Sequence, residues 1–171
     1  MAATPPSIGL HKSKGGDGSV AVCITGLFRT AAQVSPYVVH QYPNTFARFV
    51  VTNVLGVTGR AKFIHDVLTP TATRHLSEQN SSQRAGLLAC RDLITEHEAK
   101  RKNPFEWIVR QRIDTLGCTP PPMAVWPLRR SKTILVAHGS CNLFGARLAA
   151  VADNWALMTR DVFEFLSLIH I

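Results

Sequence analysis

FEWIVRQRID, at residues 105–114, predicts a buried β-strand that carries charge on one of its two faces. Successive side chains of a strand point to opposite faces, so Arg110, Arg112 and Asp114 lie together on one of them. The other face takes apolar residues that can be buried: Trp107, Val109 and Ile113. Two cations and a carboxylate at the carboxyl end of a buried strand are costly without partners. Two interpretations stay open: a structural Arg–Asp network beneath a loop, or a site that binds a phosphate and a metal.

The sequence around this stretch alternates apolar runs with helical patterns. Further strands are expected at three runs: Val20–Thr25, Phe46–Val54 and Lys132–Ala137. Helical patterns cover three segments: Thr30–His40, Arg60–Leu68 and Ser81–Lys102. Val151–Leu166 is expected to hold a short strand or turn and then a helix from near Arg160. This order predicts an α/β fold with a mostly parallel sheet and helices on both faces. Ligands of such sheets bind beyond the carboxyl ends of the strands.

Ser81–Lys102 has the clearest helical pattern of the chain. Ser81 or Ser82 can cap its amino terminus. Its apolar stripe consists of Leu87, Cys90 and Ile94. Two pairs are spaced as i,i+4 ion pairs in the favourable order: Glu96 with Lys100 and Glu98 with Lys102.

The length of 171 residues fits one domain, and the apolar fraction of 46% supports a packed core. Residues 1–19 are expected to be a disordered leader, residues 20–166 the α/β domain, and residues 167–171 a suspect tail. A signal peptide is the less favoured alternative for the leader, because Asp17 and neighbouring glycines interrupt it. No run of about 18 apolar residues is present, so no membrane span is expected. The last helix has barely begun where the sequence stops, so the domain is expected to be incomplete there.

The formal net charge of +8 favours anionic partners such as phosphates, nucleotides, nucleic acid or acidic glycans. Nucleic acid is the least favoured of these, because interleaved aromatics, zinc-ligand spacing and a basic helix are missing from the sequence. Four cysteines occur without a C-x-x-C pair: Cys23, Cys90, Cys118 and Cys141. Small buried thiols are favoured over disulfides for them.

Two other segments carry candidate functional residues. Arg29 follows the first strand after Gly26, a glycine that allows a close turn. Asp153 interrupts an apolar stretch, where it can act as a general base or simply cap a turn. His138 is interpreted as an ordinary loop histidine, because the sequence places no second metal-spaced ligand near it.

The order of the motifs resembles a group of uncharacterised glycosyltransferase-like proteins with a GT-A-type, Rossmann-like nucleotide-sugar-binding fold. The resemblance covers roughly residues 20–166. It rests on VAVCITGLFRT, FVVTN, a helix carrying Cys90, W-[IV]-V-R-x-R-x-D, and V-x-D-N-x-A-L-M-x-R. Relatives of this kind are typically Golgi-type lumenal enzymes with an amino-terminal anchor.

The resemblance implies transfer of a sugar from a nucleotide-sugar donor to a hydroxyl of an unknown glycan or protein acceptor. In GT-A-type enzymes a D-x-D element holds a divalent metal, Mn or Mg, and the donor diphosphate. Asp114 stands for its last carboxylate here, whereas Arg112 replaces its first acidic residue. An arginine at this position can neutralise the diphosphate directly, in part replacing the metal.

The resemblance also assigns roles to the other candidates. Arg29 and Arg110 are expected to contact the donor or its diphosphate, and Arg160 to contact phosphate or to orient the loop of Asp153. Asp153 is expected to approach the acceptor or the leaving group and, in an inverting reaction, to activate the acceptor hydroxyl. The alternative is a non-catalytic module of the same fold that binds a nucleotide sugar or a glycan, which the missing first carboxylate of D-x-D favours.

Overall fold

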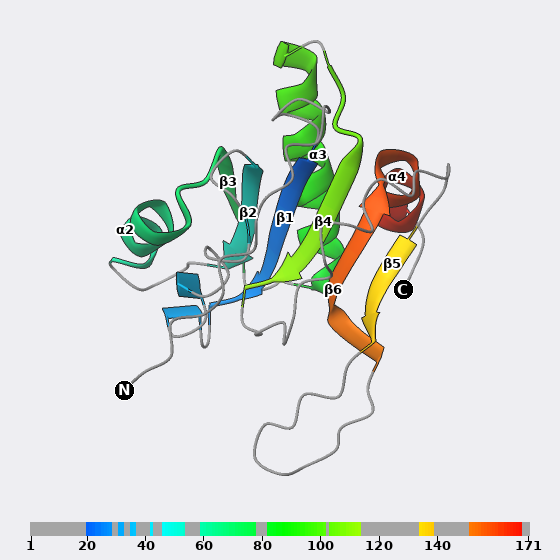
Figure 1. Ribbon diagram of the computed structural model, residues 1–171. Helices are drawn as coiled ribbons and strands as arrows, with labels where there is room; N and C mark the ends of the chain where they lie inside the picture. The colour runs from blue at the N-terminus through cyan, green and yellow to red at the C-terminus, as the bar shows by residue number, and fades with distance from the viewer. Residues whose placement is uncertain are drawn as a thin grey trace, which may run out of the picture.

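A computed structural model describes ten parts of the chain (Figure 1): residues 20–28, 31–32, 35–36, 42, 46–53, 59–77, 82–101, 103–113, 134–138 and 151–168. For residues 134–138, 151–155 and 167–168 the backbone alone is described. The expected leader, the end of the tail and most of the helix expected over residues 30–40 lie outside the described residues. So do four residues singled out by the sequence: Arg29, Asp114, Cys118 and Cys141.

The described strands form one six-stranded sheet with the order β3-β2-β1-β4-β6-β5. The strands are β1 (Val20–Leu27), β2 (Ala47–Asn53), β3 (Ala72–His75), β4 (Trp107–Arg112), β5 (Ile134–His138) and β6 (Val151–Thr159). The first four are mutually parallel, and β6 runs antiparallel to β4 and β5 on either side of it. The expected mostly parallel α/β sheet is confirmed.

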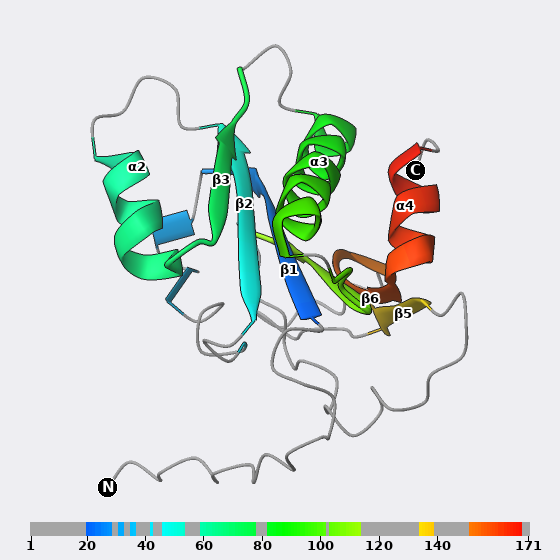
Figure 2. The same ribbon diagram turned by 90° about the horizontal axis from the view of Figure 1, so that it is seen from above.

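Helices cover both faces of this sheet (Figure 2). The face opposite α3 packs against η1 (Ile64–Leu68), a π-helical turn that continues a short helix, α2 (Arg60–Phe63). The other face packs against α3 (Gln83–Arg101) and α4 (Arg160–Leu168). Among the described helices, none combines the length and the apolar character that crossing a bilayer requires.

The two faces of β4 confirm the alternation expected from its sequence. The side chains of Trp107, Val109 and Ile113 lie in the apolar core on the side of η1. Ile108 lies in the core on the side of α3 and α4, the face that Arg110 and Arg112 share with it by the pleat. β4 therefore places Arg110 and Arg112 on the face of the sheet that α3 and α4 cover.

Helix α3 forms as its pattern predicts. The Ser82 Oγ accepts a hydrogen bond of 3.1 Å from the Ala85 amide, which caps the amino terminus. The expected apolar stripe is buried against β1 and β2: Leu87, Cys90 and Ile94. Its acidic residues are bound from other elements, because Arg74 of β3 contacts Glu96 at 2.8 Å and Arg160 of α4 binds Glu98.

Three features differ from the sequence-based expectations. β3 was not expected, because its four residues carry little apolar signal and form a strand by pairing with β2. The segment before α4 is a nine-residue strand, so the interpretation of Asp153 as a turn residue is wrong. The preference for free thiols is wrong for Cys23 and Cys90, which are joined by a disulfide.

Candidate functional site

A pocket of about 150 Å³ opens at the carboxyl ends of β1, β2 and β4. Its lining comes from these strand ends, from the residue after β3, and from the first turn of α3: Thr25, Gly26, Leu27, Val51, Thr52, Asn53, Leu76, Ser82, Gln83, Gly86 and Arg112. The chain runs outward from β1 to β2 and β3 and then returns to the other side of β1 as β4. The order of strands reverses between β1 and β4, and such a switch point is where open α/β sheets bind ligands.

The first turn of α3 forms one wall of this pocket through Ser82, Gln83 and Gly86. Two amides of this turn already bond to Ser82, since Ala85 donates to its Oγ and Gly86 donates to its carbonyl oxygen. The turn also carries the positive end of the helix dipole. Gly86 lies against β1, and a Cβ at this position would be at an ordinary contact distance of 3.5 Å from the Thr25 Cβ. This wall is therefore suited to an anionic group.

Arg112 supplies the one charged side chain among the described residues that line the pocket. It is the last residue of β4, its backbone pairs with Thr25 of β1, and it is half-buried. The side-chain amide of Gln111 donates a 2.9 Å hydrogen bond to its carbonyl oxygen and holds the strand end in place. A guanidinium and a helix amino terminus that line the same pocket both add positive potential to it.

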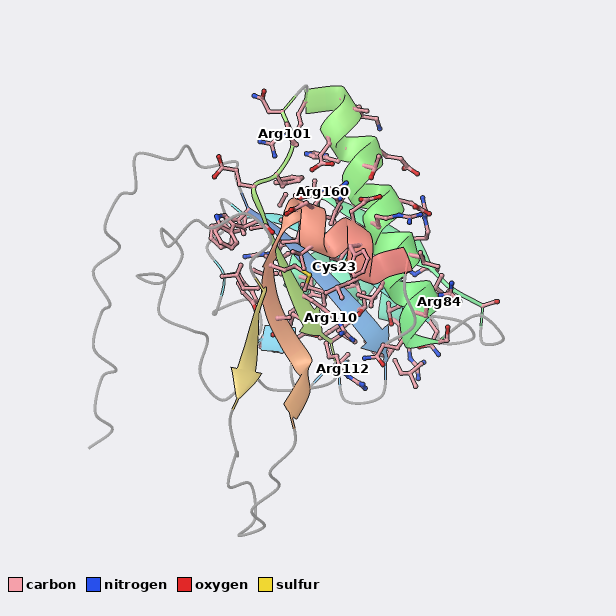
Figure 3. All side chains as sticks on the ribbon, turned by 90° about the vertical axis from the view of Figure 1, so that its right-hand side faces the viewer. Cys23, Arg84, Arg101, Arg110, Arg112 and Arg160 are labelled. Atoms are coloured by element: carbon pink, nitrogen blue, oxygen red, sulfur yellow. A yellow bond between two sulfur atoms is a disulfide. The ribbon has the colours of Figure 1, made fainter. Side chains whose placement is uncertain are left out.

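Arg110 lies one pleat before Arg112 on the same face of β4, and Figure 3 shows the two arginines following one another along the strand. Its backbone pairs with Cys23 on one side and Ala156 on the other, and 7% of the residue is exposed. Arg110 does not line the described pocket. Arg110 is buried deeper along β4 than Arg112, so it would affect a ligand only through neighbouring residues.

Asp153 and Arg160, the two candidate residues of the last sequence motif, lie at opposite ends of β6. Trp155 pairs with Gln111, so the backbone of Asp153, two residues earlier, lies toward the pocket edge. Arg160 follows the other end of β6, where its amide donates to the Glu106 carbonyl just before β4 begins. Seven residues of extended chain separate the two by roughly 20 Å, so one diphosphate cannot contact both.

The Arg160 side chain is bound to α3 and to its own helix. Its Nε lies 3.1 and 3.2 Å from the two carboxylate oxygens of Glu98, and its Nη2 donates to Thr95. Its Nη1 contacts Glu164 one turn along α4. Burial lowers the pKa of Arg160, but the hydrogen bonds to Glu98 and Glu164 outweigh it and raise the pKa above its usual value. The structure thus brings Arg112 and the Asp153 backbone to the end of β4 that adjoins the pocket, and Arg160 to the opposite end of β4.

Several residues of the pocket were not singled out from the sequence as functional. Ser82 was expected only as a cap, and Gly86 and Gln83 were not considered. The available signal was the combination of a capping serine with a glycine in the first turn of the clearest helix. Gly26 was expected at a close turn, but it lies within β1 and pairs with Thr52 of β2, so that expectation is wrong. Its φ of 139° still lies where residues with a side chain are strained.

Among the described residues that line the pocket, none supplies a carboxylate, an imidazole or a thiol. More widely, the part of the chain that the structure describes holds no group of three or more His, Cys, Asp and Glu side chains suited to a metal ion. Asp114, the candidate metal ligand, lies two residues beyond Arg112 and outside that part.

Compared with models of known protein families and with curated proteins, the sequence matches none.

Proposed function

We propose that the pocket at the ends of β1, β2 and β4 binds the diphosphate of a nucleotide sugar, and that the protein is a glycosyltransferase of GT-A type. One observation carries the proposal: Arg112 and the amino terminus of α3 line the same pocket, at the switch point of the sheet. Both features favour a compact anion, and the overall charge of +8 favours its approach.

The size of the pocket supports a diphosphate rather than a whole donor molecule. About 150 Å³ is less than the roughly 300–1,000 Å³ of sites that enclose a complete small molecule. The polar lining of Thr25, Asn53 and Ser82 suits phosphate oxygens, which accept hydrogen bonds. The nucleoside and the sugar would then extend past the strand ends.

The proposed reaction is a displacement at the anomeric carbon of the donor. A bond forms between the acceptor oxygen and this carbon, and the bond from the carbon to the diphosphate oxygen breaks. Arg112 and the helix amino terminus stabilise the negative charge that develops on the departing nucleoside diphosphate. In an inverting reaction, Asp153 would accept the proton of the acceptor hydroxyl, since its backbone lies toward the same edge.

Calorimetric titration of the full chain with uridine and guanosine diphosphate sugars and with inorganic pyrophosphate tests this proposal. Charge-assisted hydrogen bonds contribute about 1.5–3 kcal/mol, so Arg112→Ala should weaken binding roughly ten- to a hundredfold. Arg112→Lys should recover part of the affinity, because it keeps the charge without the planar fork. Arg74→Ala is the matched control, since Arg74 contacts Asp92 and Glu96 away from the pocket.

Two results would contradict the proposal: a full chain that binds none of these probes, or an Arg112→Ala variant that binds them like the unsubstituted protein. Titrations with and without manganese separate direct neutralisation by Arg112 from a requirement for metal.

A non-catalytic module that binds the same ligands is the second candidate. It is favoured by the lack of a carboxylate among the described lining residues, because a base is needed to activate the acceptor. It predicts binding without turnover. Transfer or donor hydrolysis that is lost in Asp153→Asn, with binding retained, would exclude it.

A further inference from the structure

The Cys23–Cys90 disulfide joins β1 to α3 in the interior of the domain. Both cysteines are 0% exposed, their Cα atoms are 6.1 Å apart, and 67 residues separate them in the sequence. Figure 3 shows Cys23 in the middle of the layer between the sheet and the helices. This bond is the covalent link between the two elements that supply opposite walls of the pocket.

The disulfide lies directly below the pocket on both elements. Cys23 precedes Thr25 by two residues, so the two side chains share one face of β1. Cys90 follows Gly86 by four residues, so it lies one helical turn further along the same side of α3. Thr25 and Gly86 meet at the pocket. The disulfide therefore connects α3 to β1 two strand residues and one helical turn away from the pocket residues Thr25 and Gly86.

The first turn of α3 has little apolar packing of its own to hold it there. Ser82, Gln83 and Arg84 are exposed, and Gly86 has no side chain to bury. Apolar burial in the helix begins at Leu87. A helix start without buried side chains opens easily, so the nearest strong restraint decides how firmly it is held.

We propose that the Cys23–Cys90 disulfide is a redox-dependent clamp that keeps this pocket formed, so that anion affinity is high in the oxidised protein and low in the reduced one. The inference rests on the proposed function for the identity of the ligand, but the clamp itself is a statement about β1 and α3. Buried cysteines resist reduction while the fold is closed, which makes an oxidising compartment the setting in which the pocket is competent.

Release requires local opening of α3 from β1, which exposes the buried sulfurs, and then proceeds by thiol–disulfide exchange. A thiolate of an external dithiol attacks one sulfur, the bond between the Cys23 and Cys90 sulfurs breaks, and a mixed disulfide forms. The second thiol of the reductant then resolves it. Two electrons and two protons pass to the protein, which gains two thiols, and the reductant becomes a cyclic disulfide.

Tryptic mapping first establishes the redox state of the full chain. Cleavage after Lys and Arg places the four cysteines on separate peptides: residues 15–29, 85–91, 113–129 and 133–147. A linked pair of peptides 15–29 and 85–91 identifies the oxidised state, and its loss with dithiothreitol identifies the reduced one. Both states are then compared by amide hydrogen exchange and by titration with pyrophosphate.

In the reduced state, amides in the first two turns of α3 should exchange at least about tenfold faster, while those of β2 change little. Pyrophosphate affinity should fall roughly tenfold or more. Equal exchange in the two states overturns the clamp whatever the binding result. Faster exchange with no binding in either state supports the clamp and contradicts the proposed function, so the two failures are distinguishable.

The double variant Cys23→Val, Cys90→Ala removes the bond permanently. It should behave like the reduced protein and lose its response to dithiothreitol. Ile94→Val is the matched control, since it trims buried packing one turn further along α3 but leaves the disulfide intact. If the double variant does not fold, the comparison of oxidised and reduced unsubstituted protein decides alone.

Discussion

The Arg160 guanidinium donates hydrogen bonds to both carboxylate oxygens of Glu98, 62 residues away in the sequence. These bonds connect the start of α4 to the last turns of α3. Glu98 also accepts a 2.8 Å hydrogen bond from the Phe105 amide, which leads into β4. The partly buried carboxylate of Glu98 thus connects α3, α4 and the start of β4, at the end of the strands opposite the pocket.

Arg160→Ala is therefore expected to lower the free energy of unfolding by about 2 kcal/mol, because it removes several hydrogen bonds to charged partners. Glu98→Gln should lower it to a similar extent. Neither variant should change pyrophosphate affinity by more than about twofold, since Arg160 and Glu98 lie at the end of the strands opposite the pocket. Urea unfolding and calorimetry measure the two quantities. A large loss of affinity in Arg160→Ala with unchanged stability would return this arginine to the ligand site.

Gly86 provides a graded test of the pocket. Gly86→Ala places a methyl group at ordinary contact distance from Thr25 and should raise stability by up to about 1 kcal/mol, because alanine favours the helix. Gly86→Leu should fill the pocket and weaken pyrophosphate binding at least about tenfold. Circular dichroism checks that the leucine variant keeps its helix content. Unchanged affinity in the leucine variant would place the ligand elsewhere.

Reduction of the disulfide should lower global stability as well as loosen the pocket. Closing a loop over a separation of 67 residues contributes about 4 kcal/mol in the chain-entropy account. Urea denaturation with and without dithiothreitol measures this difference, with Ile94→Val giving the same shift as the unsubstituted protein. A difference below about 1 kcal/mol would show that the bond adds little to the fold.

His97 predicts how stability depends on pH. Burial lowers its pKa from 6.5, and the charges of Arg101 and Lys100 lower it further, against an opposing effect of Glu98. The lowered pKa favours the neutral form of the ring, which stacks on Phe105 with 5.9 Å between centroids. Since the unfolded chain binds this proton more readily, the contribution is present above pH 6.5 and is lost as pH falls below it.

Unfolding free energies measured at pH 7.5 and pH 5 should therefore differ more in the unsubstituted protein than in His97→Phe. The phenylalanine keeps the ring contacts with Phe105 and Phe49 and does not titrate. An identical pH response in both proteins would assign the effect to other groups.

Local patterns made much of the fold predictable. The alternation in β4 depends only on neighbouring residues, so Trp107 and Val109 could be assigned to the core and Arg112 to the opposite face. The start of α4 at Arg160 was also predicted from its local sequence. Such signals survive folding because the pleat and the helical turn repeat within a few residues.

The rest depended on contacts between distant parts of the chain. Spacing could not pair Cys23 with Cys90 across the four described elements that lie between them, β2, α2, η1 and β3. Glu98 was expected to pair within its helix, but α4 brings Arg160 to it. The pocket itself exists only because α3 returns to the ends of β1 and β2, and no single segment carries a signal for it.

The nine-residue strand β6 is antiparallel to β4 and β5, so it brings the backbone of Asp153 toward the pocket at one end and Arg160 toward Glu98 at the other. Deleting one residue from its middle would rotate every later side chain to the wrong surface. Ala156 and Met158 would trade places with Leu157, and Arg160 would swing out of reach of Glu98. A deletion near Asp153 would thus disturb the anchoring of α4 at the other end of the strand.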